Sequence, residues 1–211
     1  MRDPGTDSVP AVVLAAGGSV RMGRPKAFLP LNTDETFLSR IACTLDRAGA
    51  APLVVVGAPE WTGRPAGLPE YTQVVINPAP DLGQLSSLQC GLAVLPAASS
   101  AVLFTLVDVP FITVETVLAL VSTAGRVGAD IVRPERSGRH GHPVLVTRVV
   151  AAALLSAESS QTTRAVLRAF AASTVDVPVE DEGAFVDVDT PEEYERVMRA
   201  QHSSPFLVRP T

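Results

Sequence analysis

The sequence predicts a Rossmann-like α/β fold: a doubly wound, mostly parallel sheet with helices on both faces, in a single domain. Short apolar runs alternate along the chain with segments in which apolar residues recur every three or four positions, as expected when strands alternate with helices. Most of the runs are apolar throughout rather than at alternate positions, which indicates strands buried on both faces. A length of 211 residues with 46% hydrophobic residues suits one large domain with a complete core.

The first half of the chain alternates strands with helices in the order that this fold requires. Strands are expected at 11–16, 52–57, 72–77 and 101–110, and helices at 36–49, 84–95 and 113–125. Phe37, Ile41 and Leu45 fall on one face of the first helix, and Gly49 is its expected stop. Thr113 is the expected N-cap of the third helix.

The second half of the chain is less regular. Strands are expected at 129–134, 142–147, 173–179 and 184–189, and helices at 149–156, 162–170 and 190–200. The start of the last helix is well marked, because Thr190 can cap it, Pro191 suits the first helical position and Glu193 completes a capping box. We expect the domain to span residues 1–200 and residues 201–211 to form a disordered tail.

Charge and cysteine content narrow the class of protein. The net charge of −5 gives no general attraction to nucleic acid or anionic lipid, so neither is an expected partner. No apolar run approaches the length of a membrane span, and residues 1–10 lack the apolar core of a signal peptide, so we expect a soluble, cytoplasmic monomer. Cys43 and Cys90 lie among apolar residues, which predicts buried free thiols rather than a disulfide or a zinc site.

A glycine-rich, basic loop follows the first expected strand, between Gly17 and Lys26. Backbone N–H groups in such a loop can converge on a phosphate, while Arg21 and Lys26 supply full positive charges. The spacing fits neither a P-loop, because Arg24 and Pro25 follow Gly23, nor the G-x-G-x-x-G dinucleotide motif. From glycine content alone, an ordinary strand-to-helix turn with two surface cations remains the alternative.

Carboxylates follow two other expected strands. Asp108 ends a long apolar run, and Asp187 and Asp189 share one side of the segment 184–189. Parallel strands end at the edge of the sheet where ligands bind, and Mg²⁺ takes one or two carboxylates together with phosphate oxygens and water. The alternatives are a turn cap before Pro110 for Asp108 and support of the Thr190 cap for Asp189. Together, loop and carboxylates predict a site for a nucleoside triphosphate with Mg²⁺, and phosphoryl or nucleotidyl transfer.

The segment 136–146 contains two histidines, His140 and His142, beside glycine and proline. With no third ligand nearby in the sequence, a metal site is the weaker interpretation. A loop that faces the substrate is the stronger one.

These residues resemble the MobA-like NTP transferases, the molybdenum cofactor nucleotidyltransferases, over residues 10–199. Five motifs carry the resemblance, and they occur in the family's order: Leu14-Ala15-Ala16-Gly17-x-Ser19-x-Arg21-Met22-Gly23-x-Pro25-Lys26; Asn77-Pro78 with Gly83 and Ser87-Leu88; Asp108-x-Pro110; Gly141-His142-Pro143; and Asp187-x-Asp189-Thr190-Pro191-Glu192. The first motif is a specific signature of the family.

The resemblance implies a set of residues for each part of the site. The nucleotide-binding set is Leu14, Ala15, Ala16, Gly17, Gly18, Ser19, Arg21, Met22, Gly23, Lys26, Asn77, Gly83 and Ser87. The catalytic set is Lys26, Arg21 and Asp108. The Mg²⁺ set is Asp108, Asp187 and Asp189, and the acceptor-binding set is Gly141, His142 and Pro143.

The resemblance also implies a reaction. The terminal phosphate of molybdopterin would attack the α-phosphorus of CTP and release pyrophosphate, with Arg21 beside the β- and γ-phosphates and Lys26 near the α-phosphate. CTP is implied because family members that use CTP read L-A-A-G and carry proline before the lysine, as Ala16 and Pro25 do here. Members that use GTP read L-A-G-G and carry an acidic residue there. Ala16 also narrows the space beside the base, which suits a pyrimidine.

Three departures from the family pattern bear on the substrates. Pro80 lies near the place of a usual aromatic residue, residues 159–164 lack a Gly-Asp-x-Gly pattern, and Val107 replaces a small residue. The alternatives are therefore GTP as the nucleotide, a sugar phosphate or methylerythritol phosphate as the acceptor, or a non-catalytic chaperone for the molybdenum cofactor. A transient contact with a molybdoenzyme or its chaperone is a further expectation.

Overall fold

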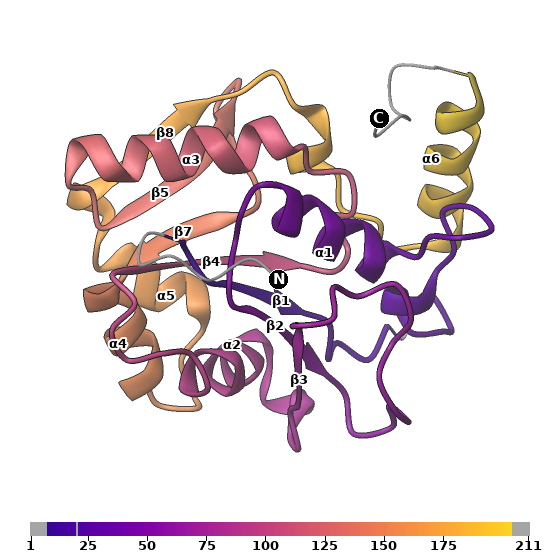
Figure 1. Ribbon diagram of the computed structural model, residues 1–211, viewed down its shortest axis with the longest axis horizontal. Helices are drawn as coiled ribbons and strands as arrows, with labels where there is room; N and C mark the ends of the chain where they lie inside the picture. The colour runs from indigo at the N-terminus through magenta and orange to yellow at the C-terminus, as the bar shows by residue number, and fades with distance from the viewer. Residues whose placement is uncertain (1–7, 20, 204–211) are drawn as a thin grey trace.

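The computed structural model describes residues 8–19 and 21–203, which form one eight-stranded sheet with helices on both faces (Figure 1). The strands are β1 (Ala11–Leu14), β2 (Leu53–Gly57), β3 (Gln73–Ile76), β4 (Ala101–Leu106), β5 (Ile131–Arg136), β6 (Arg139–His140), β7 (Val144–Thr147) and β8 (Thr174–Pro178). The α-helices are α1 (Phe37–Arg47), α2 (Gln84–Ala93), α3 (Val114–Val127), α4 (Arg148–Ser156), α5 (Thr163–Arg168) and α6 (Pro191–Ser203). Short 3₁₀ helices are η1 (Lys26–Phe28), η2 (Pro80–Leu82), η3 (Ala171–Ser173) and η4 (Glu182–Phe185).

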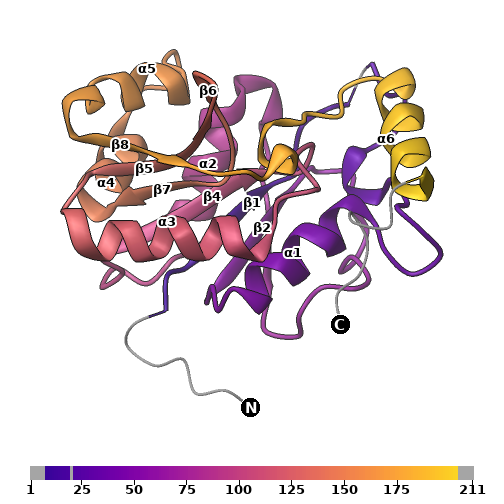
Figure 2. The ribbon, with the colours of Figure 1, turned by 90° about the horizontal axis from the view of Figure 1, so that it is seen from above.

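Two apolar layers hold the helices to the sheet. Along β1, Ala11 and Val13 belong to the layer under α1 and α3, whereas Val12 and Leu14 belong to the layer under α2, α4 and α5. Figures 1 and 2 show the two groups of helices on opposite sides of the strands. Successive residues of a strand point to opposite faces, so a strand covered on both faces must be apolar at every position. The prediction of a sheet with helices on both faces is confirmed.

The direction of winding changes at β1. The order β3-β2-β1-β4 is parallel throughout, with β2 and β3 on one side of β1 and β4 on the other. Helix α1, which follows β1, lies on one face of the sheet, and α2, which leads from β3 to β4, lies on the other. A reversal of this kind opens a crevice at the carboxyl ends of the two central strands. The crevice therefore lies beyond Leu14 and Leu106, which are paired in the register of β1 and β4.

The other half of the sheet is mixed. β7 runs antiparallel to both β4 and β5, β5 and β6 form an antiparallel pair, and β8 returns parallel to β5. Only residues 137–143 separate β5 from β7, and they include β6. A connection this short has no helical crossover, so it can join only antiparallel strands. The sequence predicts β5, β7 and β8 but neither β6 nor this reversal.

The strand expected at 184–189 is wrong. Residues 182–185 form η4, and residues 186–189 have no partner strand among the described residues. The N–H of Val188 donates to the carbonyl of Asp108 at 2.9 Å, and the N–H of Asp189 donates to Glu193 at 2.7 Å. Val188 is fully buried, which explains why apolar and acidic residues alternate in a segment outside the sheet.

The predicted helix ends are mostly confirmed. Gly49 has a φ of +80° just after α1, a conformation that glycine adopts without strain. Thr113 accepts from the N–H of Thr116 at the start of α3. Thr190 and Glu193 form the expected capping box of α6. That helix continues to Ser203, three residues past the expected boundary at residue 200, and the rest of the expected tail, 204–211, lies outside the described residues.

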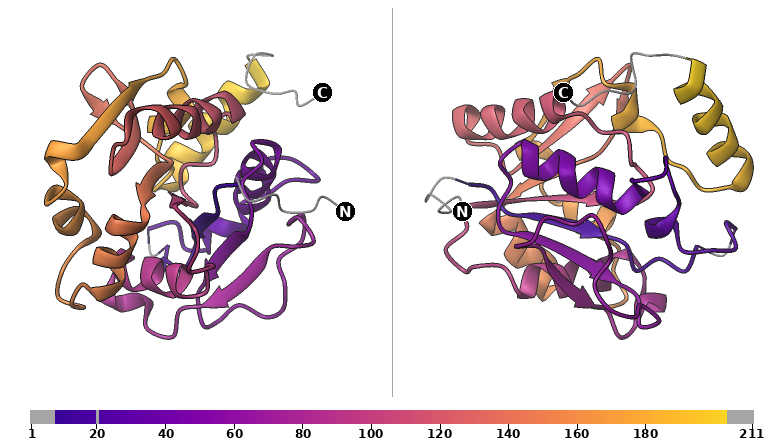
Figure 3. Two further views of the ribbon diagram at one scale, coloured as in Figure 1. Left: turned by 60° about the vertical axis from the view of Figure 1, so that its left-hand side comes forward. Right: turned by 45° about the vertical axis from the view of Figure 1, so that its right-hand side comes forward.

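The last helix lies at one edge of the molecule, beside the segment that follows η1 (Figures 2 and 3). The hydroxyl of Tyr194 donates to the carbonyl of Pro30 at 2.6 Å, and its ring lies 5.9 Å from that of Phe37. These contacts hold α6, which follows Asp189, against the segment that begins at Lys26.

Two smaller expectations have different outcomes. Cys43 is exposed and Cys90 is half-buried, so the prediction of buried thiols is wrong, although both are free. None of the described helices is long and apolar enough to cross a membrane.

Candidate active site

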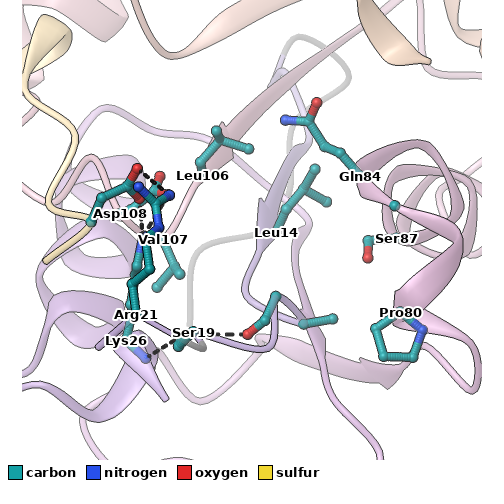
Figure 4. A pocket seen from close by; sticks show the side chains of 14 residues that line it. Leu14, Ser19, Arg21, Lys26, Pro80, Gln84, Ser87, Leu106, Val107 and Asp108 are labelled. Atoms are coloured by element: carbon teal, nitrogen blue, oxygen red, sulfur yellow. Dashed lines mark hydrogen bonds and ion pairs between the residues drawn. The ribbon is translucent and has the colours of Figure 1, made fainter. Parts of the chain in front are cut away.

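A cavity of about 530 Å³ opens at the carboxyl ends of β1 and β4, where the winding reverses. Its lining comes from four separate parts of the chain: Leu14, Ala16, Gly17, Ser19, Arg21, Lys26, Pro80, Gly83, Gln84, Ser87, Leu106, Val107, Asp108 and Asp189. Figure 4 shows Arg21, Lys26 and Asp108 together on one side, with Pro80, Gln84 and Ser87 across from them. One wall is therefore charged, and the opposite wall belongs to the start of α2.

Ser19 organises the loop after β1. Its backbone has a φ of +46°, and its carbonyl accepts from the N–H groups of Met22 and Gly23 at 2.9 and 3.1 Å. Its hydroxyl accepts from the N–H of Lys26 at 3.1 Å. Within the described residues, the N–H groups of Gly17 and Gly18 have no acceptor. A tight turn that leaves backbone donors available at a cavity wall is suited to an anion.

Lys26 is the centre of an ion-pair network and the single lysine of the chain. Its Nζ donates to Oδ2 of Asp108 at 3.1 Å and also to Oδ1 of Asp189. Arg21 donates through Nη2 to Oδ2 of Asp189 at 2.7 Å. The Lys26 side chain is 11% exposed and that of Arg21 is 69% exposed. The lysine is therefore held inside the site, while the arginine lies at its rim.

The three aspartates have different surroundings. The hydrogen bond from Lys26 is the main reason that the pKa of Asp189 is lowered. Burial raises the pKa of Asp187, and the charges of Asp108 and Asp189 raise it further, while Lys26 and Arg139 oppose the shift. Oδ1 of Asp108 is buried and has no hydrogen-bond partner among the described residues. A buried carboxylate oxygen of this kind is available to a cation.

The wall opposite the charged groups is the start of α2. Gly83 precedes the helix with a φ of +95°, a conformation that favours glycine. Asn77 is 1% exposed, and its Nδ2 donates to the hydroxyls of Ser86 and Ser87 at 2.9 and 3.0 Å. Its Oδ1 accepts from the N–H of Ala79 at 2.9 Å. Asn77 therefore fixes the end of β3 to the first turn of α2.

Comparison with known proteins explains this arrangement. Residues 11–176 match the model of the MobA-like NTP transferase domain. The chain belongs to the MobA-like NTP transferase family. A probable molybdenum cofactor guanylyltransferase of Mycobacterium tuberculosis is 35% identical over 144 residues, 66% of this chain and 69% of the relative. A molybdenum cofactor guanylyltransferase of Sinorhizobium fredii is 32% identical over 208 residues, 92% of this chain and 94% of the relative.

Solved structures of similar fold extend the comparison. The Mycobacterium tuberculosis rv0371c homologue from Mycobacterium sp. strain JC1 has a TM-score of 0.73 and 29% identity, covering 91% of this chain and 96% of that one. Rv0371c itself, in a complex with manganese, has a TM-score of 0.68 and 22% identity, covering 92% and 99%. The family expected from the sequence is confirmed, and the two relatives above are named guanylyltransferases, whereas the motif predicted a cytidylyltransferase.

This MobA-like NTP transferase has carboxylates that fit a divalent cation. Within the described residues, no group of three or more His, Cys, Asp and Glu side chains is arranged to hold a metal by itself. Mg²⁺ needs only one or two carboxylates when phosphate oxygens and water complete its shell. The unpartnered Oδ1 of Asp108 meets that need, and Asp187 or Asp189 could add a second carboxylate.

The structure brings most of the predicted nucleotide-binding residues to the cavity. The residues that line it are Leu14, Ala16, Gly17, Ser19, Arg21, Lys26, Gly83 and Ser87. Those that do not line it are Ala15, Gly18, Met22, Gly23 and Asn77. Ala15 and Met22 belong to the core under α1, so they support the loop from behind. The predicted catalytic residues Arg21, Lys26 and Asp108 all lie at the cavity, whereas Asp187 does not line it.

The predicted acceptor residues lie behind Asp108. A Cβ atom on Gly141 would lie 2.2 Å from the carbonyl oxygen of Ala184, and the N–H of His142 donates to that oxygen at 2.9 Å. The His142 ring stands edge-on to Phe104 at 6.2 Å, and burial lowers its pKa although Asp108 opposes the shift. Gly141, His142 and Pro143 do not line the cavity, so the structure places them beside the site rather than on its surface.

Sequence reasoning missed several residues of the site. Gln84 and Leu106 line the cavity without belonging to any predicted set, and Pro80 and Val107 entered only as departures from the family pattern. Arg139 donates from Nη2 to the carbonyl of Phe185 at 2.6 Å, and its charge acts on Asp187. Arg139 does not line the cavity, and its place beside Gly141-His142-Pro143, the set that the resemblance assigns to the acceptor, is the sequence signal that could have pointed to it.

Proposed function

We propose that the protein transfers a nucleoside monophosphate from a nucleoside triphosphate to the phosphate of the molybdenum cofactor, with GTP as the donor. The observation that carries the proposal is the meeting of Lys26, Arg21 and Asp108 at one cavity in a MobA-like NTP transferase. Lysine and arginine complement phosphate, and an aspartate with a free oxygen complements a metal–phosphate complex. The names of the relatives support the acceptor and the nucleotide.

The proposed reaction is an in-line displacement. An oxygen of the acceptor phosphate forms a bond to the α-phosphorus, and the bond from that phosphorus to pyrophosphate breaks. The loop amides and Arg21 bind the β- and γ-phosphates, and Lys26 stabilises the charge that develops around the α-phosphate. Mg²⁺ held by Asp108 with Asp187 or Asp189 would neutralise phosphate charge. No general base is needed, because a phosphate acceptor is already ionised.

A second nucleotide, CTP, is favoured by two residues of the loop. Ala16 lines the cavity with a methyl group, and Pro25 precedes Lys26. Both residues match the pattern that the resemblance associates with CTP. We place GTP first because both relatives from Mycobacterium tuberculosis and Sinorhizobium fredii carry guanylyltransferase names, and the second matches 92% of the chain.

Two other functions fit the site less well. Another phosphorylated acceptor, such as a sugar phosphate or methylerythritol phosphate, would use the same nucleotide cavity but would need different acceptor contacts. A chaperone that only binds the cofactor would not need Lys26 and Asp108 together at a cavity. We also propose that the product passes to a molybdoenzyme or its chaperone in a transient contact.

The test is pyrophosphate release with Mg²⁺ and molybdopterin, compared among GTP, CTP, ATP and UTP. The proposal predicts release that depends on molybdopterin and is fastest with GTP. Fastest release with CTP would support the loop residues over the names of the relatives. No release with any nucleotide, despite nucleotide binding, would mean that molybdopterin is not the acceptor.

A further inference from the structure

Both oxygens of Asp189 are bound to the two cations of the site. Oδ1 accepts from Lys26, and Oδ2 accepts from Arg21 at 2.7 Å. These are the cations that the proposed function assigns to the phosphates of the nucleotide. Asp189 lies 163 residues from Lys26 in the chain, so the pairing depends on the fold and not on local sequence.

Lys26 and Arg21 cannot form strong ion pairs with the carboxylates and with phosphates at the same time. Lys26 and Arg21 are matched in charge by Asp108 and Asp189, and Asp187 adds another negative charge nearby. A bare polyphosphate would therefore have to displace Asp189 and approach an excess of negative charge. Asp108 and Asp189 would pair with a bound divalent cation instead of with Lys26 and Arg21, and the cation would add positive charge, so both obstacles would be removed.

We propose that Asp189 is a positioning residue that competes with the nucleotide's phosphates for Lys26 and Arg21. While the site is empty, it holds both cations at the cavity wall. When the carboxylates bind a divalent cation instead, Lys26 and Arg21 become available to bind phosphate. Metal binding and phosphate binding are therefore coupled through Asp189. This inference rests on the phosphate site of the proposed function but not on the acceptor.

The single lysine makes the first test direct. Lys26 and the N-terminal amine are the two amines that an acetylating reagent can modify, and the second is an internal reference in mass spectrometry. We expect slow acetylation of Lys26 in EDTA, acceleration of about fivefold or more with Mg²⁺, and protection when inorganic pyrophosphate is added with Mg²⁺. A Lys26 rate that Mg²⁺ does not change would overturn the proposal.

The second test measures binding of inorganic pyrophosphate by calorimetry in EDTA. Asp189→Asn should bind metal-free pyrophosphate about tenfold more tightly than the wild type, because Lys26 and Arg21 lose their competitor. Asp187→Asn is the matched control, since it removes the same charge without an ion pair to either cation among the described residues. An equal gain in both variants, or no gain in Asp189→Asn, would refute competition by this residue.

The outcomes separate this inference from the proposed function. If the wild type does not bind pyrophosphate even with Mg²⁺, the cavity is not a phosphate site and both ideas fail. If pyrophosphate binds with Mg²⁺ but molybdopterin accepts no nucleotide, only the acceptor is wrong. A thermal melt shows whether Asp189→Asn is folded. If the variant is unfolded, the acetylation rate of wild-type Lys26 with and without Mg²⁺ still tests whether metal binding releases Lys26 from Asp189.

Discussion

Lys26→Ala should lower kcat by about 10²–10³ while the protein remains folded. The Lys26 side chain is 11% exposed and lies between Asp108 and Asp189, so its charge acts where solvent screening is weak. Loss of one group that stabilises developing charge in such a site costs about 2.7–4 kcal/mol of transition-state stabilisation, which corresponds to that fall in rate.

Arg21 is 69% exposed and binds only Asp189 among the described residues, so Arg21→Ala should lower kcat by only about tenfold.

The folding cost of the same lysine substitution should be small. Without Lys26, the carboxylates of Asp108 and Asp189 lose their shared cation, but their side chains are 22% and 32% exposed. Water can therefore solvate them in part, and we expect a loss of about 1–2 kcal/mol, below the roughly 3–5 kcal/mol of a fully buried pair. The assay is pyrophosphate release at saturating nucleotide, beside a thermal melt. Turnover within about threefold of the wild type would remove Lys26 from the mechanism.

Three further predictions test other parts of the site. Asp108→Asn should raise the Mg²⁺ concentration for half-maximal activity by about tenfold or more, and an unchanged titration would count against this ligand. Gly141→Ala should lower the thermal midpoint by about 5 °C, because its Cβ would meet the Ala184 carbonyl at 2.2 Å, whereas Gly125→Ala in α3, with nothing within 4 Å, should not. Arg139→Ala should raise the KM for the acceptor about tenfold without changing the KM for the nucleotide. Arg136→Ala, whose arginine pairs with Glu182 at 3.1 Å, should change neither, and equal effects would exclude the acceptor role.

The sequence is sufficient to predict that the loop after β1 and Asp108 lie together, because the physical signals there are local. The loop from Gly17 to Lys26 follows directly from an apolar strand, and Asp108 follows the neighbouring strand of the sheet. Parallel strands bring their carboxyl ends to one edge, so a correct fold class brings these residues together. The structure has them at one cavity.

The positions of Asp189 and Arg139 could not be predicted as well, because they depend on contacts between distant segments. Alternating valine and aspartate at 186–189 has the period of a strand, and periodicity alone cannot show that Val188 is buried under the end of β4 instead. Nothing local indicates that Asp189 binds Lys26, or that Arg139 lies beside Phe185. The antiparallel direction of β7 likewise follows from the short connection at 137–143, and the sequence pattern does not show which way that connection turns.

The central claim is transfer of a nucleotide to the molybdenum cofactor at the cavity of Lys26. The most direct measurement is the mass of the product formed from molybdopterin, Mg²⁺ and equal amounts of GTP and CTP, with the wild type and Lys26→Ala. We predict molybdopterin carrying one GMP with the wild type and little or none with the variant. Molybdopterin recovered without a nucleotide, or the same yield from both proteins, would contradict the account. A product carrying CMP would keep the reaction and the site but replace the donor.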